Sequence, residues 1–208
     1  MPIDDHDETP GLAEAAAILR GSGRPPLQAL WPLLLVWGSA CVVIGVSLAA
    51  FGTARPTRIV MAAALLTGAA VSVLIMQLAG WGIYGRVLGR LRAILGSAVI
   101  ALGAVGLAVA LVPAPTVAGV PTVWAASVAA LAVGTAWGLA TTLVSRHRLF
   151  AAVSVVWVVF FVAIVAVGLP IAAYVLIAGG AATLIGAIPA RTAEIRALLA
   201  PRPLPPEP

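Results

Sequence analysis

The sequence predicts an all-α integral membrane protein, a polytopic helical bundle with six transmembrane helices. Of its 208 residues, 62% are hydrophobic and only 9% are charged, whereas about 25% of the residues in a soluble domain are charged. The apolar residues form runs of about 20, the length that crosses a bilayer as a helix. All seven acidic residues lie within 4–14 and 194–207. Lipid is therefore the expected solvent of the central part of the chain.

The apolar runs predict spans at about 27–51, 59–85, 93–112, 122–144, 149–167 and 170–190. The last two come from one apolar run, 149–190, which as a single helix would be roughly 60 Å long, about twice the hydrocarbon core. Gly168-Leu169-Pro170 predicts the reversal, because a helix ends before a proline. Short loops are expected at 52–58 and 86–92. A polar segment, 1–26, with a short helix at 12–20 precedes the membrane domain, 27–190, and a cytoplasmic helix with a proline-rich tail, 191–208, follows it.

All 12 basic residues are arginines, and their placement predicts the orientation. Cytoplasmic loops carry an excess of Lys and Arg. Only Arg55 and Arg58 fall on one side of the predicted spans, and the other ten fall on the side that holds both ends of the chain. Both termini are therefore expected in the cytoplasm, with the bundle in the inner (cytoplasmic) membrane of a bacterium. Five arginines are expected to contact anionic lipids: Arg86, Arg90, Arg92, Arg146 and Arg148. Because the arginines are scattered, nucleic acid is not an expected partner.

Small residues repeat along several spans and predict close helix packing. Helices in lipid associate where small side chains let their backbones approach. The predicted faces consist of Ala126, Ala130, Gly134 and Gly138 in the fourth span, Ala64, Gly68 and Ser72 in the second, and Gly38 and Gly45 in the first. A further row, Ala178, Ala182, Gly186 and Ala190, lies in the sixth. These faces could pack within the bundle, against a membrane-protein partner, or against a second copy of the chain.

Ionisable side chains are missing from the spans. No Asp, Glu, His, Lys or Arg occurs in 27–54, 59–85, 93–145 or 149–190, although intramembrane ionisable residues usually mark proton relays, ion paths and catalysis. We therefore expect no catalytic residues, no metal and no cofactor. Gln77 is the most polar residue deep in a span, and it is a candidate to line a ligand site with the deep tryptophans Trp37 and Trp137.

Two functions agree with these features. The first is a non-catalytic accessory or structural subunit that binds another membrane protein through its small-residue faces. The alternative is a carrier or binding component for a neutral or apolar small molecule. In size and span number the chain is similar to the substrate-binding components of energy-coupling-factor vitamin transporters, a similarity of architecture without a matching substrate motif. An enzyme is the third hypothesis, with chemistry at the cytoplasmic face around Arg86, Arg90, Arg92 and His147.

Overall fold

The computed structural model describes residues 30–78, 85–112, 114–145 and 148–199. Its helices are α2 (Leu30–Phe51), α3 (Arg55–Leu78), α4 (Gly85–Leu111), α5 (Thr122–Ser145), α6 (Arg148–Val167) and α7 (Leu169–Leu199). Five of them are long and apolar enough to cross a membrane, and α6 has a shorter apolar stretch, Ala151–Val167. The chain is thus an all-α, multi-pass membrane protein. The predicted helix at 12–20 and the tail at 201–208 lie outside the described residues.

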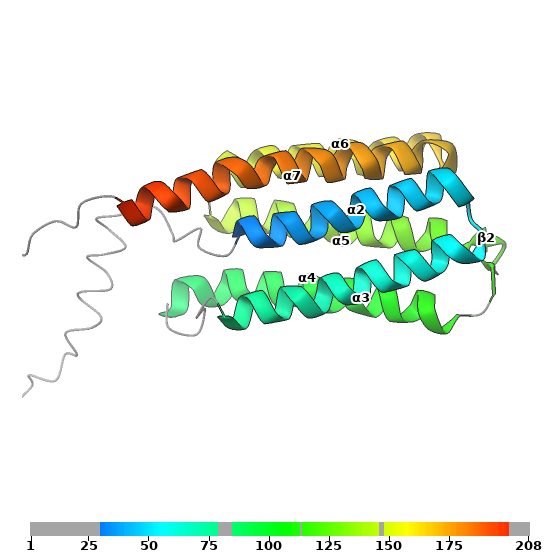
Figure 1. Cartoon of the computed structure of the whole chain (residues 1–208), viewed down its shortest axis with the longest axis horizontal. Coiled ribbons are helices and arrows are strands. Elements are labelled where there is room, and N and C mark those ends of the chain that lie inside the picture. Colours follow the sequence, from blue (N-terminus) through cyan, green and yellow to red (C-terminus); the bar gives the residue numbers. More distant parts are fainter. Residues whose placement is uncertain (1–29, 79–84, 113, 146–147, 200–208) are drawn as a thin grey trace, which may run out of the picture.

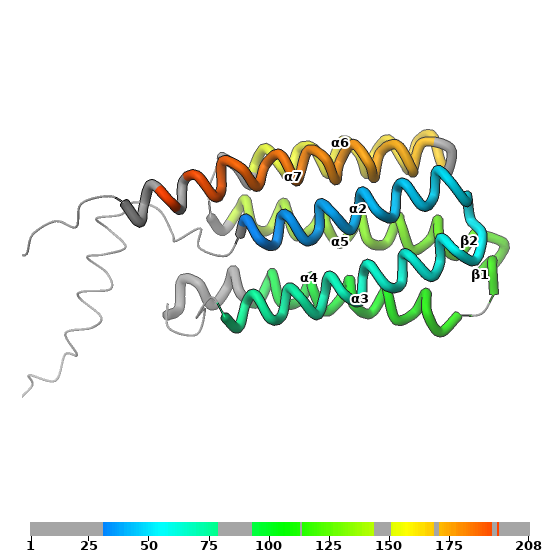
Figure 2. Tube along the Cα trace, in the orientation of Figure 1, coloured from blue at the N-terminus to red at the C-terminus, as the bar shows by residue number. Residues whose placement is uncertain are grey.

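The six helices form a closed ring. Each helix packs against its neighbours in sequence, and α7 closes the ring against α2 through the most extensive contact between any two of the helices. In Figure 1, α7, α2 and α3 lie in a front row, with α6, α5 and α4 behind them. The trace in Figure 2 shows that α2 begins and α7 ends toward the same end of the bundle. The six helices therefore enclose a common interior.

The first turn of the chain is tighter than predicted. Gly52, with φ of +58°, ends α2, and its N–H bonds to the Leu48 carbonyl at 2.9 Å. Helix α3 begins at Arg55, four residues before the predicted 59. Pro56 fits in the first helical turn, where a backbone N–H has no helical partner. The fully buried Thr57 hydroxyl donates to the Gly52 carbonyl at 2.7 Å and so fixes this turn.

Two other boundaries differ from the prediction. Residues 86–92, predicted as a loop, form the first turns of α4, because arginine and leucine are good helix formers and no proline interrupts them. Helix α7 continues without a break past 190 to Leu199 and includes Pro189. Proline removes one helical hydrogen bond. In the next turn of the helix, the Thr192 hydroxyl donates a hydrogen bond to the Ile188 carbonyl at 2.8 Å.

The connection between α4 and α5 contains a small hairpin that the sequence did not predict. Strands β1 (Thr116–Val117) and β2 (Val120–Pro121) pair in antiparallel fashion. Ala118 and Gly119 between them have φ of +51° and +78°, as the two central residues of a type I′ turn require. Arg58 reaches over from α3, and its Nη1 donates to the Ala114 carbonyl at 3.1 Å.

Glycines let α2 and α7 approach until their backbones touch. A Cβ on Gly180 would lie 2.7 Å from the Gly38 carbonyl oxygen and 2.9 Å from the Val42 nitrogen. A Cβ on Gly45 would lie 2.8 Å from the Ala173 oxygen. At the end of this contact, the guanidinium of Arg191 lies 5.2 Å from the centre of a Trp31 ring, in cation–π geometry. The first and last described helices are therefore closely packed along much of their length.

Glycines also allow close contact between helices at other sides of the ring. A Cβ on Gly106 of α4 would lie 2.8 Å from the Leu65 Cβ of α3, and one on Gly179 of α7 would lie 2.9 Å from the Phe160 ring of α6. Between α5 and α6, Gly138 faces Ser154, whose hydroxyl is 2.8 Å from that of Thr142. This hydrogen bond, and a second one from the Thr135 hydroxyl to the Trp157 carbonyl at 3.4 Å, join the two helices.

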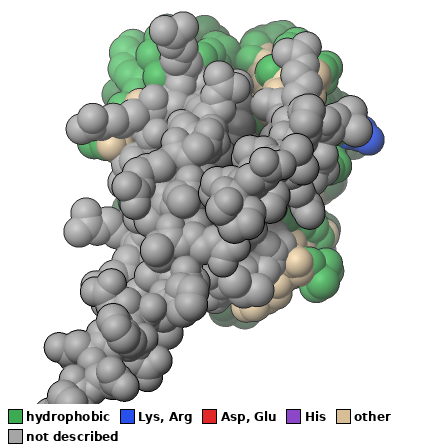
Figure 3. All heavy atoms as spheres, turned by 90° about the vertical axis from the view of Figure 1, so that its left-hand side faces the viewer, with side chains coloured by type: hydrophobic (Ala, Val, Ile, Leu, Met, Phe, Trp, Pro, Cys, Tyr) green, Lys and Arg blue, Asp and Glu red, His purple; other side chains and the backbone are tan. Residues whose placement is uncertain are grey.

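The outer surface of the bundle is apolar. Helix α6 exposes Val155, Val159, Val162 and Val165, and every other helix also exposes large hydrophobic side chains. Figure 3 looks at the bundle from one end, and hydrophobic side chains form most of the visible rim of the described part. An apolar exterior on long apolar helices is suited to contact with lipid.

Candidate ligand cavity at the centre of the ring

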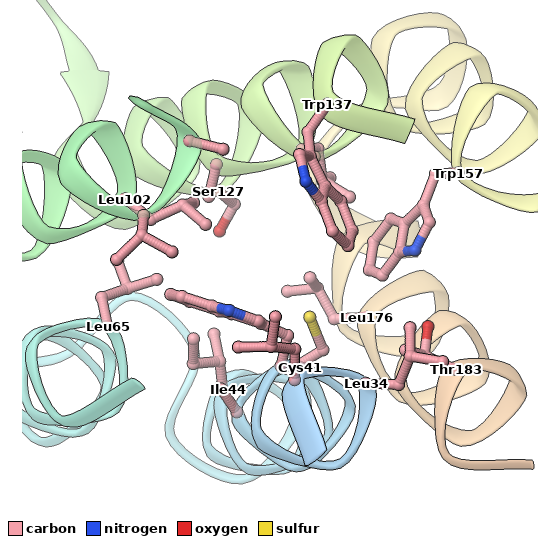
Figure 4. Close-up of a pocket in the computed structure, with 18 of the residues that line it drawn as sticks. Leu34, Cys41, Ile44, Leu65, Leu102, Ser127, Trp137, Trp157, Leu176 and Thr183 are labelled. Carbon is pink, nitrogen blue, oxygen red and sulfur yellow. The ribbon is translucent and has the colours of Figure 1, made fainter. Parts of the chain in front are cut away.

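A cavity of about 80 Å³ lies at the centre of the ring, and all six described helices line it (Figure 4). Figure 4 shows Trp137 and Trp157 projecting from α5 and α6 toward the interior, with Cys41 of α2 across from them. The lining is almost wholly apolar. It consists of Leu33, Leu34, Trp37, Ala40, Cys41 and Ile44 of α2, Met61 and Leu65 of α3, Leu95, Ala98, Val99 and Leu102 of α4, Ser127, Ala130, Leu131, Gly134 and Trp137 of α5, Trp157 of α6, and Leu176 and Thr183 of α7.

Small residues on α5 leave room for this cavity. Gly134 and Ala130 both line it, and a Cβ built on Gly134 would have no neighbouring atom within 4 Å. In contrast to Gly38 or Gly180, Gly134 therefore makes no close contact with a neighbouring helix. One turn further, at Gly138, α5 meets α6. The predicted small-residue face of α5 thus serves two purposes, an open wall at Ala130 and Gly134 and a helix contact at Gly138.

The residues that line the cavity extend along the axis of the bundle. On α2 they run from Leu33 to Ile44, which is about 16 Å along a helix axis. An apolar cavity of about 150 Å³ in another protein accepts a benzene ring, whereas the volume here is about 80 Å³. A small space with a lining of this length suits part of an extended hydrocarbon chain better than a flat ring.

The polar atoms of the lining are few, and both of its hydroxyl groups are already satisfied. The Ser127 hydroxyl donates to the Val123 carbonyl at 2.8 Å, and the Thr183 hydroxyl to the Gly179 carbonyl at 2.7 Å. The indole Nε1 of Trp137 is buried and has no hydrogen-bond partner among the described residues. A buried donor without a partner is unfavourable, so an acceptor atom on a ligand near Trp137 would lower the free energy of the complex. The cavity can thus select an apolar molecule with at most one weakly polar group.

A second, open groove of about 600 Å³ runs along the outside of the bundle between α2 and α3. Much of its lining is small, with Ser39 and Ala40 on α2 and Ala63, Thr67 and Gly68 on α3. Ala40 lines both the groove and the central cavity. The two spaces therefore lie on opposite sides of the same thin wall.

Of the three residues predicted to line a ligand site, two line the cavity and one does not. Trp37 and Trp137 both line the cavity. Gln77 is exposed near the end of α3 and does not line it. Trp157, another tryptophan deep in a predicted span, is 7% exposed and completes the aromatic part of the lining.

Most residues of the predicted small-residue faces pack against other parts of the same chain. Gly38 and Gly45 pack on α7, and Gly68 lies beneath the Trp37 ring. Ser72 and Ala126 are buried, and Ala64 packs against the core. On α7, Ala173 and Gly180 contact α2. Of the row predicted from Ala178 to Ala190, Ala178 is exposed, whereas Ala190 is buried in a cluster with Leu34 of α2.

Four of the five predicted lipid-contacting arginines belong to helix starts at one end of the bundle. Arg86, Arg90 and Arg92 belong to the first turns of α4, and Arg148 begins α6. Arg146 lies outside the described residues. Within the described ranges, no three His, Cys, Asp or Glu side chains come together.

Compared with protein-family models, with curated proteins and with solved structures, the chain matches none.

Proposed function

We propose that this protein is a non-enzymatic binding component or carrier for a neutral, chain-like apolar molecule. The observation that carries the proposal is the small apolar cavity, whose lining extends along the bundle on all six described helices and to which α5 contributes the open wall at Gly134. Ligand pockets are typically apolar clefts with few polar groups, and those of bundles lie between helices. The alternative use of the small-residue faces, as docking surfaces, is supported less well because most of them pack inside the chain.

The proposal includes an orientation of the bundle in the membrane. Helices α4 and α6 begin with arginines, and Arg191 lies near the end of α7, all at the end of the bundle where α2 begins. Arg55 and Arg58 lie at the opposite end, at the start of α3. The positive-inside rule assigns the arginine-rich end to the cytoplasm. We propose six spans with this end in the cytoplasm of a bacterium, where the arginines contact anionic lipids of the inner membrane.

Binding can be tested with two brominated probes of equal carbon number, bromodecane and bromoadamantane. Bromine quenches tryptophan fluorescence at close range, and Trp37, Trp137 and Trp157 line the cavity. With the full-length protein in lipid nanodiscs, we expect bromodecane to quench saturably, because the bromine end of an extended chain can enter the cavity. The bulky cage of bromoadamantane is expected to quench only in proportion to its concentration in the lipid. Linear, unsaturable quenching by both probes would refute the proposal.

A non-catalytic accessory subunit is the second candidate. The exposed valines of α6, Val155, Val159, Val162 and Val165, support it because they form a regular face that no described helix covers. Its test is purification in mild detergent followed by mass spectrometry, with the variant Val159→Arg as a control. A stoichiometric membrane protein that co-purifies with the wild type and is lost from the variant is the expected result for this candidate. A single-component sample, whether monomer or homo-oligomer, would remove a heterologous partner from consideration.

A further inference from the structure

We infer that the groove between α2 and α3 is the lateral route by which an apolar ligand passes between the bilayer and the central cavity, with Trp37 as the gate. This inference rests on the proposed function, since it concerns the same ligand. Trp37 lines the cavity from α2, while Gly68 of α3 lines the groove. A Cβ on Gly68 would lie only 3.2 Å from Cζ3 and 3.3 Å from Cη2 of Trp37. The indole ring therefore rests directly on Gly68, between the two spaces.

Three other walls of the ring are held at short range. Backbones touch between α2 and α7 at Gly38 and Gly180, and Gly106 of α4 packs on Leu65 of α3. Between α5 and α6, the Thr142 and Ser154 hydroxyls are 2.8 Å apart. Opening any of these three walls requires two helix backbones to separate or a buried hydrogen bond to break. Between α2 and α3, the Thr57 hydroxyl donates to the Ser47 carbonyl at 3.2 Å near one end of the two helices. At Gly68, in the middle of α3, opening the wall requires a single side chain, Trp37, to move off the glycine.

The chemistry of the ligand fits this route. Exposing apolar surface to water is unfavourable, so a hydrocarbon chain reaches the protein from the lipid and not from solution. The groove offers apolar and small side chains at membrane depth, including the exposed Ser39, Ala63 and Thr67. A chain lying in this groove would be next to the Trp37 gate. Glycine at position 68 leaves room for the ring to slide, because a larger residue would collide with it.

The single cysteine of the chain provides the test. Cys41 lines the cavity one helical turn from Trp37. A thiol enclosed by apolar side chains is inert, so the rate at which N-ethylmaleimide, a small neutral reagent that dissolves in membranes, modifies Cys41 reports opening of the cavity. In nanodiscs we expect Trp37→Ala to raise this rate at least tenfold. The matched control is Trp157→Ala, which enlarges the same cavity from the α6 side and is expected to change the rate less than threefold. Cys41→Ala gives the background.

A blocking variant makes the test independent of cavity size. Ala63→Trp fills the outer groove from an exposed position that does not line the cavity, and we expect it to slow the modification of Cys41 at least fivefold. Val155→Trp, an exposed change on α6, should have no effect. Equal rates for Trp37→Ala and Trp157→Ala, or an unchanged rate for Ala63→Trp, would overturn the gate.

Failure of the gate and failure of the proposed function give different results. Bromodecane should protect Cys41 from modification if the cavity binds it. Protection of Cys41 together with equal rates in the two tryptophan variants would refute the gate alone. If the rates of Cys41 modification differ between the two tryptophan variants but bromodecane protects none of the variants, the proposed function is refuted. The groove would then be a path for the reagent only.

Discussion

Replacing Gly180 with valine is expected to lower the free energy of unfolding by about 2–3 kcal/mol, which is in the upper part of the range for overpacked interiors. The reason is the backbone contact between α2 and α7. A Cβ at this position would lie 2.7 Å from the Gly38 oxygen and 2.9 Å from the Val42 nitrogen. Backbone atoms cannot rotate away as a side chain can, so the two helices have to separate along the whole contact. Reversible unfolding in mixed micelles, followed by circular dichroism, measures the effect.

The control for this prediction is Gly96→Val on α4. Gly96 is also helical, but a Cβ there would have nothing within 4 Å. Glycine and valine differ by well under about 1 kcal/mol in helix propensity, so the free energy of unfolding of this variant should stay close to that of the wild type. Equal stability of Gly180→Val and Gly96→Val would show that the α2–α7 contact does not hold the ring closed.

Replacing Gly134 with leucine is expected to abolish the saturable binding of bromodecane while leaving the protein as stable as the wild type or more so. Gly134 lines the cavity, and the space beyond its Cα is open. A leucine side chain can therefore occupy the volume that the ligand would take. Leucine also favours a helix over glycine by roughly 0.8 kcal/mol, and its new contacts add dispersion energy. Tryptophan quenching and thermal unfolding of the same sample measure the two effects.

Gly96→Leu separates these two effects. It makes the same change at an open position that does not line the cavity, so it should gain helix propensity and retain binding. Loss of binding in both variants would attribute the effect to a general change in the bundle. Retained binding in Gly134→Leu would place the ligand elsewhere than in the cavity.

The sequence was sufficient to predict an all-α membrane bundle, because charge and hydropathy vary along the chain on the length scale of a span. The chain reverses at Gly168, where φ is +85°, as expected from the proline two residues later. The extent of α3 and α4 was less predictable. Arginines at helix starts resemble loop residues in a hydropathy profile, although Arg55, Arg86 and Arg90 are helical.

The site was predictable only in part, since hydropathy does not specify which side of an apolar helix faces inward. In a soluble helix a polar face gives this direction, but these helices are apolar on all sides. Small residues consequently showed where backbones could approach and not which neighbour they would meet. The adjacent glycines Gly179 and Gly180 illustrate this ambiguity, because one faces α6 and the other faces α2. Likewise Gly134 resembled a contact residue and instead borders the cavity.

The contact that closes the ring joins the earliest and the latest of the described helices, and this has a consequence for biosynthesis. A ribosome makes α2 before the other described helices, and α2 waits until α7 has been inserted before Gly38 and Gly45 meet their partner. During that interval the glycine face of α2 and the interior of the unfinished bundle remain open to lipid and to the insertion machinery. A nascent chain halted before α7 would therefore be a natural substrate for membrane chaperones and quality-control proteases.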